Sequence, residues 1–68
     1  KKLSFKEKRE FDLLTTEIES LEREKTLLEA ELGSGLLSPE ELIGKSNRIG
    51  EIITLIDQRT DRWLELCE

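Results

Sequence analysis

The residues in this sequence whose types and spacing point to chemistry are basic and lie close together at its start. The first ten residues, KKLSFKEKRE, carry five basic and two acidic side chains, which gives this stretch a local charge of +3. The whole chain has a formal net charge of -5, so the rest of it sums to -8. Lys and Arg contacts to phosphate oxygens give sequence-independent, salt-sensitive affinity for nucleic acid. The asymmetry therefore favours a phosphate-binding patch at this end of the chain.

The sequence contains no arrangement of side chains typical of a catalytic or metal site. It has no histidine and a single cysteine, Cys67, so the commonest general base and metal ligand is missing and no intramolecular disulfide can form. Its sixteen acidic residues are spread along helical patterns, where they cap helices or pair with Lys and Arg three or four residues away. No glycine-rich phosphate loop is present. We therefore expect that this chain is not an enzyme by itself and binds no metal or cofactor.

Length and composition indicate a small soluble domain. A chain of 68 residues, 40% of them charged, lies below the size at which one core gives comfortable stability. No apolar run approaches the ~18 residues that span a bilayer, and the N-terminus lacks the hydrophobic segment of a signal peptide. We expect a cytoplasmic location without a membrane partner. The absence of an initial methionine predicts a domain of a longer protein.

A long amphipathic helix is predicted over residues 5–32. Its apolar residues recur at alternating spacings of three and four, with Lys25 in the one gap. These residues are Phe11, Leu14, Ile18, Leu21, Leu28 and Leu32. Ser4 followed three residues later by Glu7 is the pattern of a capping box. Residues 1–4 are therefore expected to be the end of a linker and the helix cap.

A second helix is predicted over residues 39–67. The segment GSG at residues 33–35 is expected to end the first helix, since glycine adopts the left-handed conformation without a steric penalty. Ser38 and Glu41 then form another capping box, and Pro39 suits the first helical position. The second helix repeats the seam spacing, with two basic residues in the gaps. The seam holds Leu42, Ile49, Ile52, Ile56, Trp63 and Leu66, with Lys45 and Arg59 between them.

The short connection over residues 33–38, here called the tip, makes the two helices antiparallel neighbours. The expected fold is all-α, a two-helix antiparallel coiled-coil hairpin over residues 5–68. Its open end is the end that carries both chain termini. In the expected register Phe11 meets Trp63 near the open end, and Leu21 meets Ile53 further along.

Two short motifs allow a family to be suggested. LSFKEKREFDLL at residues 3–14 and DRWLEL at residues 61–66 resemble the C-terminal coiled-coil domain of ABC-F ATPases, particularly the Uup-like branch. That domain typically begins LSYKxxRExExL and ends with an RWxxLE-like segment, so Phe5 stands where the family has tyrosine. The matching positions are Leu3, Ser4, Lys6, Arg9, Glu10 and Leu13 or Leu14 at the start, and Arg62, Trp63 and Leu66 at the end.

This resemblance implies the setting in which the chain works. ABC-F proteins have two tandem ATP-binding cassettes and no transmembrane domains, and many act on the ribosome. In the Uup-like branch the C-terminal hairpin is associated with binding nucleic acid, including DNA. The resemblance thus implies a parent ATPase whose cassettes, and not this chain, hold ATP and Mg, with DNA or ribosomal RNA and the cassettes themselves as partners.

The hairpin prediction brings the basic residues of both helices to the open end. The candidate nucleic-acid-binding residues are Lys1, Lys2, Lys6, Lys8, Arg9, Arg59 and Arg62. Phe5 beside them is expected to be exposed, either at a frayed end, or in contact with a domain outside this chain, or as an aromatic ring that stacks on a base.

An alternative reading is a structural or protein-interaction module whose charges are simply solvated. Such a module would form a weak homodimer, or dock on the ATPase cassettes or the ribosome. The apolar residues that fall outside or broaden the seam are Leu13, Leu27, Ile53, Leu55 and Leu64.

Overall fold

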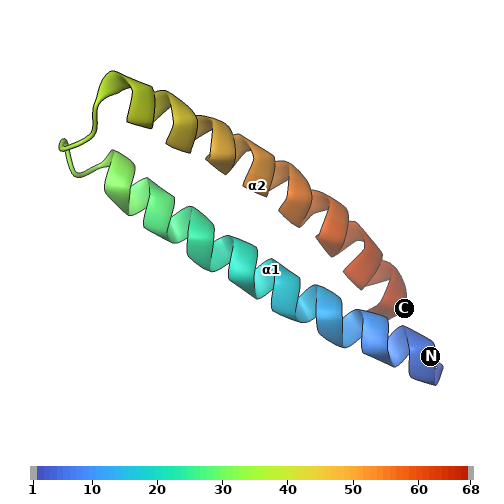
Figure 1. Cartoon of the computed structure of the whole chain (residues 1–68). Coiled ribbons are helices and arrows are strands. Elements are labelled where there is room, and N and C mark those ends of the chain that lie inside the picture. Colours follow the sequence, from blue (N-terminus) through green and yellow to red (C-terminus); the bar gives the residue numbers. More distant parts are fainter. Residues whose placement is uncertain (1, 68) are drawn as a thin grey trace.

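The computed structural model describes residues 2–67 and consists of two long antiparallel helices. Helix α1 spans Phe5–Leu32 and helix α2 spans Pro39–Cys67. The helices lie side by side along their whole length, and both chain termini lie at the same end (Figure 1). The molecule is a rod with principal extents of 50 × 15 × 14 Å. The all-α hairpin expected from the heptad spacing is therefore confirmed.

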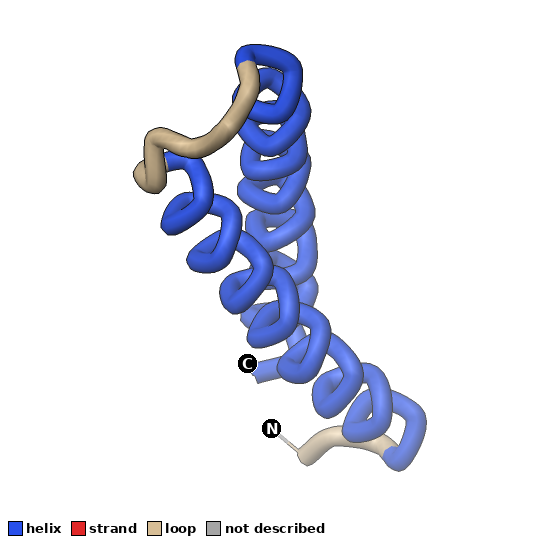
Figure 2. The backbone as a smooth tube through the Cα atoms, turned by 60° about the vertical axis from the view of Figure 1, so that its left-hand side comes forward, coloured by secondary structure: helices blue, strands red, loops and turns tan. Residues whose placement is uncertain are grey.

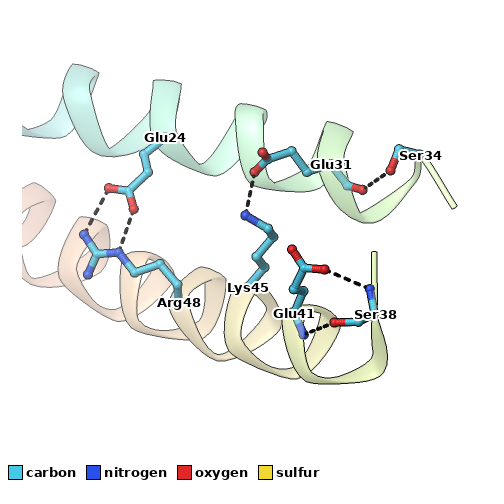
Figure 3. Close-up of polar contacts among 7 residues, drawn as sticks. All are labelled: Glu24, Glu31, Ser34, Ser38, Glu41, Lys45 and Arg48. Atoms are coloured by element: carbon cyan, nitrogen blue, oxygen red, sulfur yellow. Dashed lines mark hydrogen bonds and ion pairs between the residues drawn. The ribbon is translucent and has the colours of Figure 1, made fainter. Parts of the chain in front are cut away.

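Both helices begin with a capping box. In α1 the Glu7 backbone N–H donates to Ser4 Oγ at 3.1 Å, and the Ser4 N–H donates to the Glu7 carboxylate at 3.1 Å. In α2 the Glu41 N–H donates to Ser38 Oγ at 3.2 Å and the Ser38 N–H to Glu41 Oε1 at 3.0 Å, as Figure 3 shows. The Ser38 bonds hold the pKa of Glu41 below its ordinary value. Each box satisfies backbone donors that would otherwise lack a partner, which stabilises a helix by about 1 kcal/mol.

The GSG segment ends α1, as the sequence predicts, and one of its two glycines takes the left-handed conformation. Gly33 at the end of α1 is right-handed, with φ -82°; its N–H donates to the Glu29 carbonyl and the Ser34 N–H donates to the Glu31 carbonyl, both at 3.1 Å. The left-handed residue is Gly35, with φ 75°. Ser34 adds to the cap formed by Gly33, because its hydroxyl donates to the Glu31 carbonyl at 2.7 Å and accepts the Leu36 N–H at 3.2 Å. The tube in Figure 2 shows the loop passing between the two helix ends.

A thin apolar seam between the helices forms the core. Ile52 is 0% exposed, Leu66 3% and Leu14 8%, and the other seam residues are half-buried or exposed. The prediction that Leu21 meets Ile53 is not supported, since Ile53 is 46% exposed and its neighbour Ile52 takes the inner position. The difference follows from helix geometry, because adjacent residues point about 100° apart at 3.6 residues per turn. Because so few side chains are fully buried, each of them contributes a large share of the stability.

Two glycines weaken the tip half of α2, and replacing them gives a first prediction. Gly44 and Gly50 are helical and exposed, and an added Cβ meets no heavy atom within 4 Å at either position. Glycine in a helix interior costs about 1 kcal/mol relative to alanine. We expect the double variant Gly44→Ala/Gly50→Ala to raise the free energy of unfolding by roughly 1–2 kcal/mol, measured by urea denaturation. A lower free energy of unfolding would show that these positions pack more closely than the structure has them.

Candidate nucleic-acid interface

The structure places the predicted basic residues that it describes at the open end, on two adjacent helices. Lys2 precedes α1, whereas Lys6, Lys8 and Arg9 lie in its first turns. Arg59 and Arg62 lie near the end of α2, which runs back to the same end of the rod (Figure 1). Lys1 lies outside the described residues. The hairpin thus brings together charges that are about fifty residues apart in the sequence.

Arg62 is held by carboxylates. Its Nε donates to Glu10 Oε2 at 2.7 Å and its Nη2 to Glu10 Oε1 at 2.9 Å, which is a bidentate pair across the two helices. A further bond of 3.4 Å joins it to Glu65. The Arg62 guanidinium holds the pKa of Glu10 below its ordinary value, and Glu10 in turn raises the pKa of Arg62. Bidentate geometry of this kind fixes orientation as well as charge.

Two more of the predicted cations also have carboxylate partners. Arg59 Nε lies 3.4 Å from Glu17 Oε2, again across the helices. Lys8 Nζ donates to Asp12 Oδ1 at 3.0 Å and lies 5.9 Å from the centroid of the Phe11 ring. Within residues 2–67, Lys2, Lys6 and Arg9 form no salt bridge, although the charge of Lys6 helps to lower the pKa of Glu10. Among the described residues of the open end, the basic side chains without a salt bridge therefore lie on the α1 side.

A row of glutamates along α1 extends this pairing over the whole rod. They recur every seven residues, and each meets a basic residue of α2. The cross-helix pairs are Glu10–Arg62, Glu17–Arg59, Glu24–Arg48 and Glu31–Lys45. Figure 3 shows the two pairs nearer the tip, including the bidentate bonds of 2.7 and 3.0 Å between Arg48 and Glu24. We call this side of the hairpin the ion-paired edge.

The sequence analysis missed this row, although a signal for it exists. Each of these glutamates directly precedes a seam position of α1, which in a coiled coil is a flank that faces the neighbouring helix. The seven-residue repeat is therefore readable in the sequence. The α2 partners follow no such repeat, because Arg48 and Arg62 lie on the flank while Lys45 and Arg59 occupy gaps in the seam itself.

An aromatic pair joins the helices at the open end. The Phe11 and Trp63 rings are stacked with centroids 5.2 Å apart and an interplanar angle of 22°, which confirms the predicted contact. The indole Nε1–H donates to Thr15 Oγ1 at 2.8 Å. Phe5, by contrast, is 86% exposed, as its position outside the seam predicted. The open end thus combines a fixed aromatic pair inside with a free aromatic ring outside.

Comparison with family models matches residues 2–68 to the family described as the ABC transporter C-terminal domain. The chain belongs to this family. The match confirms the resemblance to the C-terminal domain of an ABC-F type protein, whereas the Uup-like branch stays a prediction. Neither the curated proteins nor the solved structures contain a match.

The two motifs that suggested an ABC C-terminal domain contact each other in the structure. Glu10 and Phe11 come from the first motif, Arg62 and Trp63 from the second, and they meet as the bidentate ion pair and the stacked rings. Ser4 of the first motif caps α1. These residues close the open end of the domain, so Arg62 holds the two helices together and presents less free charge than its sequence position suggested.

The charged side chains of this C-terminal domain form ion pairs at its surface. No group of three or more potential metal ligands is found among the residues that the structure describes. None of the helices described is both long and apolar enough to cross a membrane. The ionisable groups whose pKa is shifted are all surface carboxylates and their partners, an arrangement that stabilises charges and does not prepare them for proton transfer.

The ion-paired edge predicts how stability changes with pH. Hydrogen bonds from Arg62 and Arg48 hold the pKa values of Glu10 and Glu24 below the ordinary 4.5. A lowered pKa in the folded state gives stability that is present above 4.5 and is lost as pH falls through the folded-state value. We expect the thermal midpoint, followed by circular dichroism, to fall below pH 4.5. In Glu10→Gln/Glu24→Gln the midpoint should start lower and fall less, whereas a midpoint that rises on acidification would mean that relief of the net negative charge dominates.

Proposed function

We propose that this chain is the non-catalytic, nucleic-acid-binding C-terminal domain of a cytoplasmic ABC-F protein, and that it binds DNA or RNA through its open end. On this proposal ATP and Mg are bound and ATP is hydrolysed by the cassettes of the parent protein. The family match supports the setting. The observation that carries the proposal is the group of basic side chains on the α1 side, Lys2, Lys6 and Arg9, which form no salt bridge with any described residue of an otherwise acidic chain.

The proposal assigns different roles to the basic residues. Lys2, Lys6 and Arg9 are exposed and give the contacts with phosphate oxygens, which need no rearrangement of existing ion pairs. Lys8, Arg59 and Arg62 are held by Asp12, Glu17 and Glu10, so a phosphate would have to compete with a carboxylate for them. Arg59 and Arg62 join the two helices, whereas the Lys8–Asp12 pair lies within α1. The exposed ring of Phe5 beside Lys6 supports a further contact by stacking on an unpaired base.

A charge-neutralising variant tests this assignment. In Lys2→Gln/Lys6→Gln/Arg9→Gln we expect the affinity for a labelled 20-base-pair DNA duplex or RNA hairpin to fall roughly tenfold or more. The slope of log K against log salt should become less negative by ~0.9 for each phosphate that the variant no longer neutralises. Fluorescence anisotropy at several salt concentrations measures both quantities, and circular dichroism checks that helicity is kept.

A matched control separates local contacts from total charge. The variant Arg23→Gln/Lys25→Gln/Lys45→Gln also loses three positive charges, but at positions further from the open end. Lys25 and Lys45 form only partly exposed ion pairs, which contribute about 0–1 kcal/mol each. We expect its affinity to stay within about twofold of the original chain. An equal loss in the two triple variants would contradict binding at the open end.

One observation favours a second candidate function, docking on a protein. Leu13, Leu27 and Leu64 are 50–67% exposed, and exposed apolar side chains that gather into a patch are typical of docking sites. They do not form one patch with Leu55, however, because Leu55 and Leu64 are nine residues apart and therefore point to opposite sides of α2. Leu55 lies on the ion-paired edge, where it lines a hollow with Glu17 and Arg48. A weak homodimer or a contact with the cassettes through these residues predicts that Leu27→Lys lowers the sedimentation coefficient at high protein concentration.

A further inference from the structure

The two edges of the hairpin differ in the polar contacts that join α1 to α2. On the ion-paired edge, four salt bridges cross from α1 to α2. On the opposite edge, the contact of described residues that crosses is the hydrogen bond from Trp63 to Thr15. Between the helices on this side lie two shallow hollows that share Glu22. We call these two hollows together the Trp63 groove.

Apolar and aromatic side chains line the floor of the Trp63 groove. The first hollow, of about 270 Å³, is lined by Thr15, Ile18, Glu19, Glu22, Thr60 and Trp63. The second, of about 290 Å³, is lined by Glu22, Lys25, Thr26, Ile53, Ile56 and Asp57. Each is smaller than the range of about 300–1,000 Å³ that is usual for small-molecule pockets. The groove therefore suits single side chains projecting from a peptide better than a free small molecule.

The rim of the groove is mainly acidic, although Lys25 lines the second hollow and Arg23 lines a neighbouring hollow with Glu19 and Glu22. Glu19 and Glu22 on α1 and Asp57 on α2 are exposed and form no salt bridge among residues 2–67. Lys25, the basic side chain that lines the groove, lies 3.6 Å from Glu29. Unpaired carboxylates beside exposed apolar surface complement a partner that brings both apolar and basic side chains, and they repel phosphate. This surface is thus distinct from the basic open end.

The indole ring of Trp63 is held in a fixed orientation at the groove. Its Nε1–H is bonded to Thr15 and its ring is stacked on Phe11, so its orientation is fixed before anything binds. Indole attracts cations over its face more strongly than the other aromatic side chains do. A Lys or Arg side chain entering the first hollow would meet the indole together with the carboxylates of Glu19 and Glu22.

We propose that the Trp63 groove binds a basic amphipathic helix of a partner protein. A Lys or Arg of that helix sits against Trp63 between Glu19 and Glu22, and an apolar side chain packs on Ile53, which is 46% exposed. Trp63 and Ile53 are ten residues apart on α2, or about 15 Å at 1.5 Å per residue. The two anchors of the partner are therefore about three helical turns apart, and the bound state is a three-helix arrangement of the helix-in-groove type.

The experiment uses Trp63, the single tryptophan of the chain, as its own reporter. The probe is a designed 18-residue amphipathic helix with leucine on one face and lysine on both flanks, and its counterpart carries glutamate at every lysine position. We expect the lysine peptide to change the Trp63 emission in a saturable, one-to-one titration and the glutamate peptide to leave it unchanged. In Glu19→Gln/Glu22→Gln the affinity for the lysine peptide should fall roughly tenfold, because two charges next to the bound cation are removed.

Matched controls make each outcome decisive. The variant Glu51→Gln/Asp61→Asn removes the same net charge from exposed positions of α2 that line neither hollow, and its affinity should stay within about twofold. Equal losses in the two double variants, or binding of the glutamate peptide, would overturn the proposal. So would a concentration-dependent dimer in which Trp63 is already shielded from iodide quenching, because the occupant would then be a second copy of the chain. Binding of nucleic acid should be unaffected by Glu19→Gln/Glu22→Gln, which keeps this test separate from that of the open end.

Discussion

Replacing Ile52 with alanine is expected to lower the free energy of unfolding by about 2–5 kcal/mol. Ile52 is the one fully buried side chain among the residues described, and only Leu14 and Leu66 come close to it. A domain of this size has a total stability of roughly 3–10 kcal/mol. The loss therefore removes a large part of the stability, and the variant should be partly unfolded at room temperature.

The neighbouring residue supplies the control for this prediction. Ile53→Ala should change stability by less than about 1 kcal/mol, since Ile53 is 46% exposed and alanine is the better helix former. Urea denaturation followed by circular dichroism at 222 nm measures both variants. Similar losses at the two positions would show that α2 is rotated relative to α1, and that the seam is not the one described.

Replacing Trp63 with alanine is expected to lower the free energy of unfolding by about 3–5 kcal/mol. The change removes the stacking on Phe11 and the bond to Thr15, which together join the helices at the open end. Without them the last turns of α2 would separate from α1. The carboxylate partners of Arg59 and Arg62 would then no longer be held opposite them, so the affinity for nucleic acid should change together with stability.

A conservative variant separates the two contributions of this side chain. Trp63→Phe keeps an aromatic ring against Phe11 and loses the hydrogen bond, so it should be destabilised by about half as much as Trp63→Ala or less. Hydrogen exchange locates the effect, because opening should be fastest in the amides near Trp63 and slower in those near the tip. Equal amide exchange rates along the whole of α2 in Trp63→Ala would mean that Trp63 does not stabilise the open end locally.

Much of the fold follows from patterns that act locally along the chain. The spacing of Phe11, Leu14 and Ile18 identifies the seam because a helix places such residues on one face. Ser4 with Glu7 marks a helix start because its two hydrogen bonds need only the geometry of one helical turn. The contact of Phe11 with Trp63 was also predictable, since the length of the tip sets the register of an antiparallel pair.

The features that the sequence did not reveal depend on relations between the helices. The seam spacing already placed Ile52 inside and Ile53 at its margin, but the pairing of Leu21 with Ile53 was wrong because it depends on how the two helices are set against each other. The positive charge of the open end was predicted from composition. Which of its basic side chains pair with carboxylates and which do not was not predicted. Arg62 is bound by Glu10, a residue 52 positions away, while Arg9 forms no salt bridge with the residues that the structure describes. Only the pairing of the helices decides which cations remain available to a ligand.

The central claim is that the free basic side chains of the open end bind nucleic acid, and its most direct test is a salt titration of the unaltered chain. Labelled duplex DNA, single-stranded DNA and structured RNA would each be titrated with the chain at low and at moderate ionic strength, with binding followed by fluorescence anisotropy. We predict binding to at least one of them, with log K falling against log salt with a slope of about -2 to -3, as two or three neutralised phosphates require. Absence of binding to all three at low salt would contradict the account, and would leave docking on a protein as the function of this hairpin.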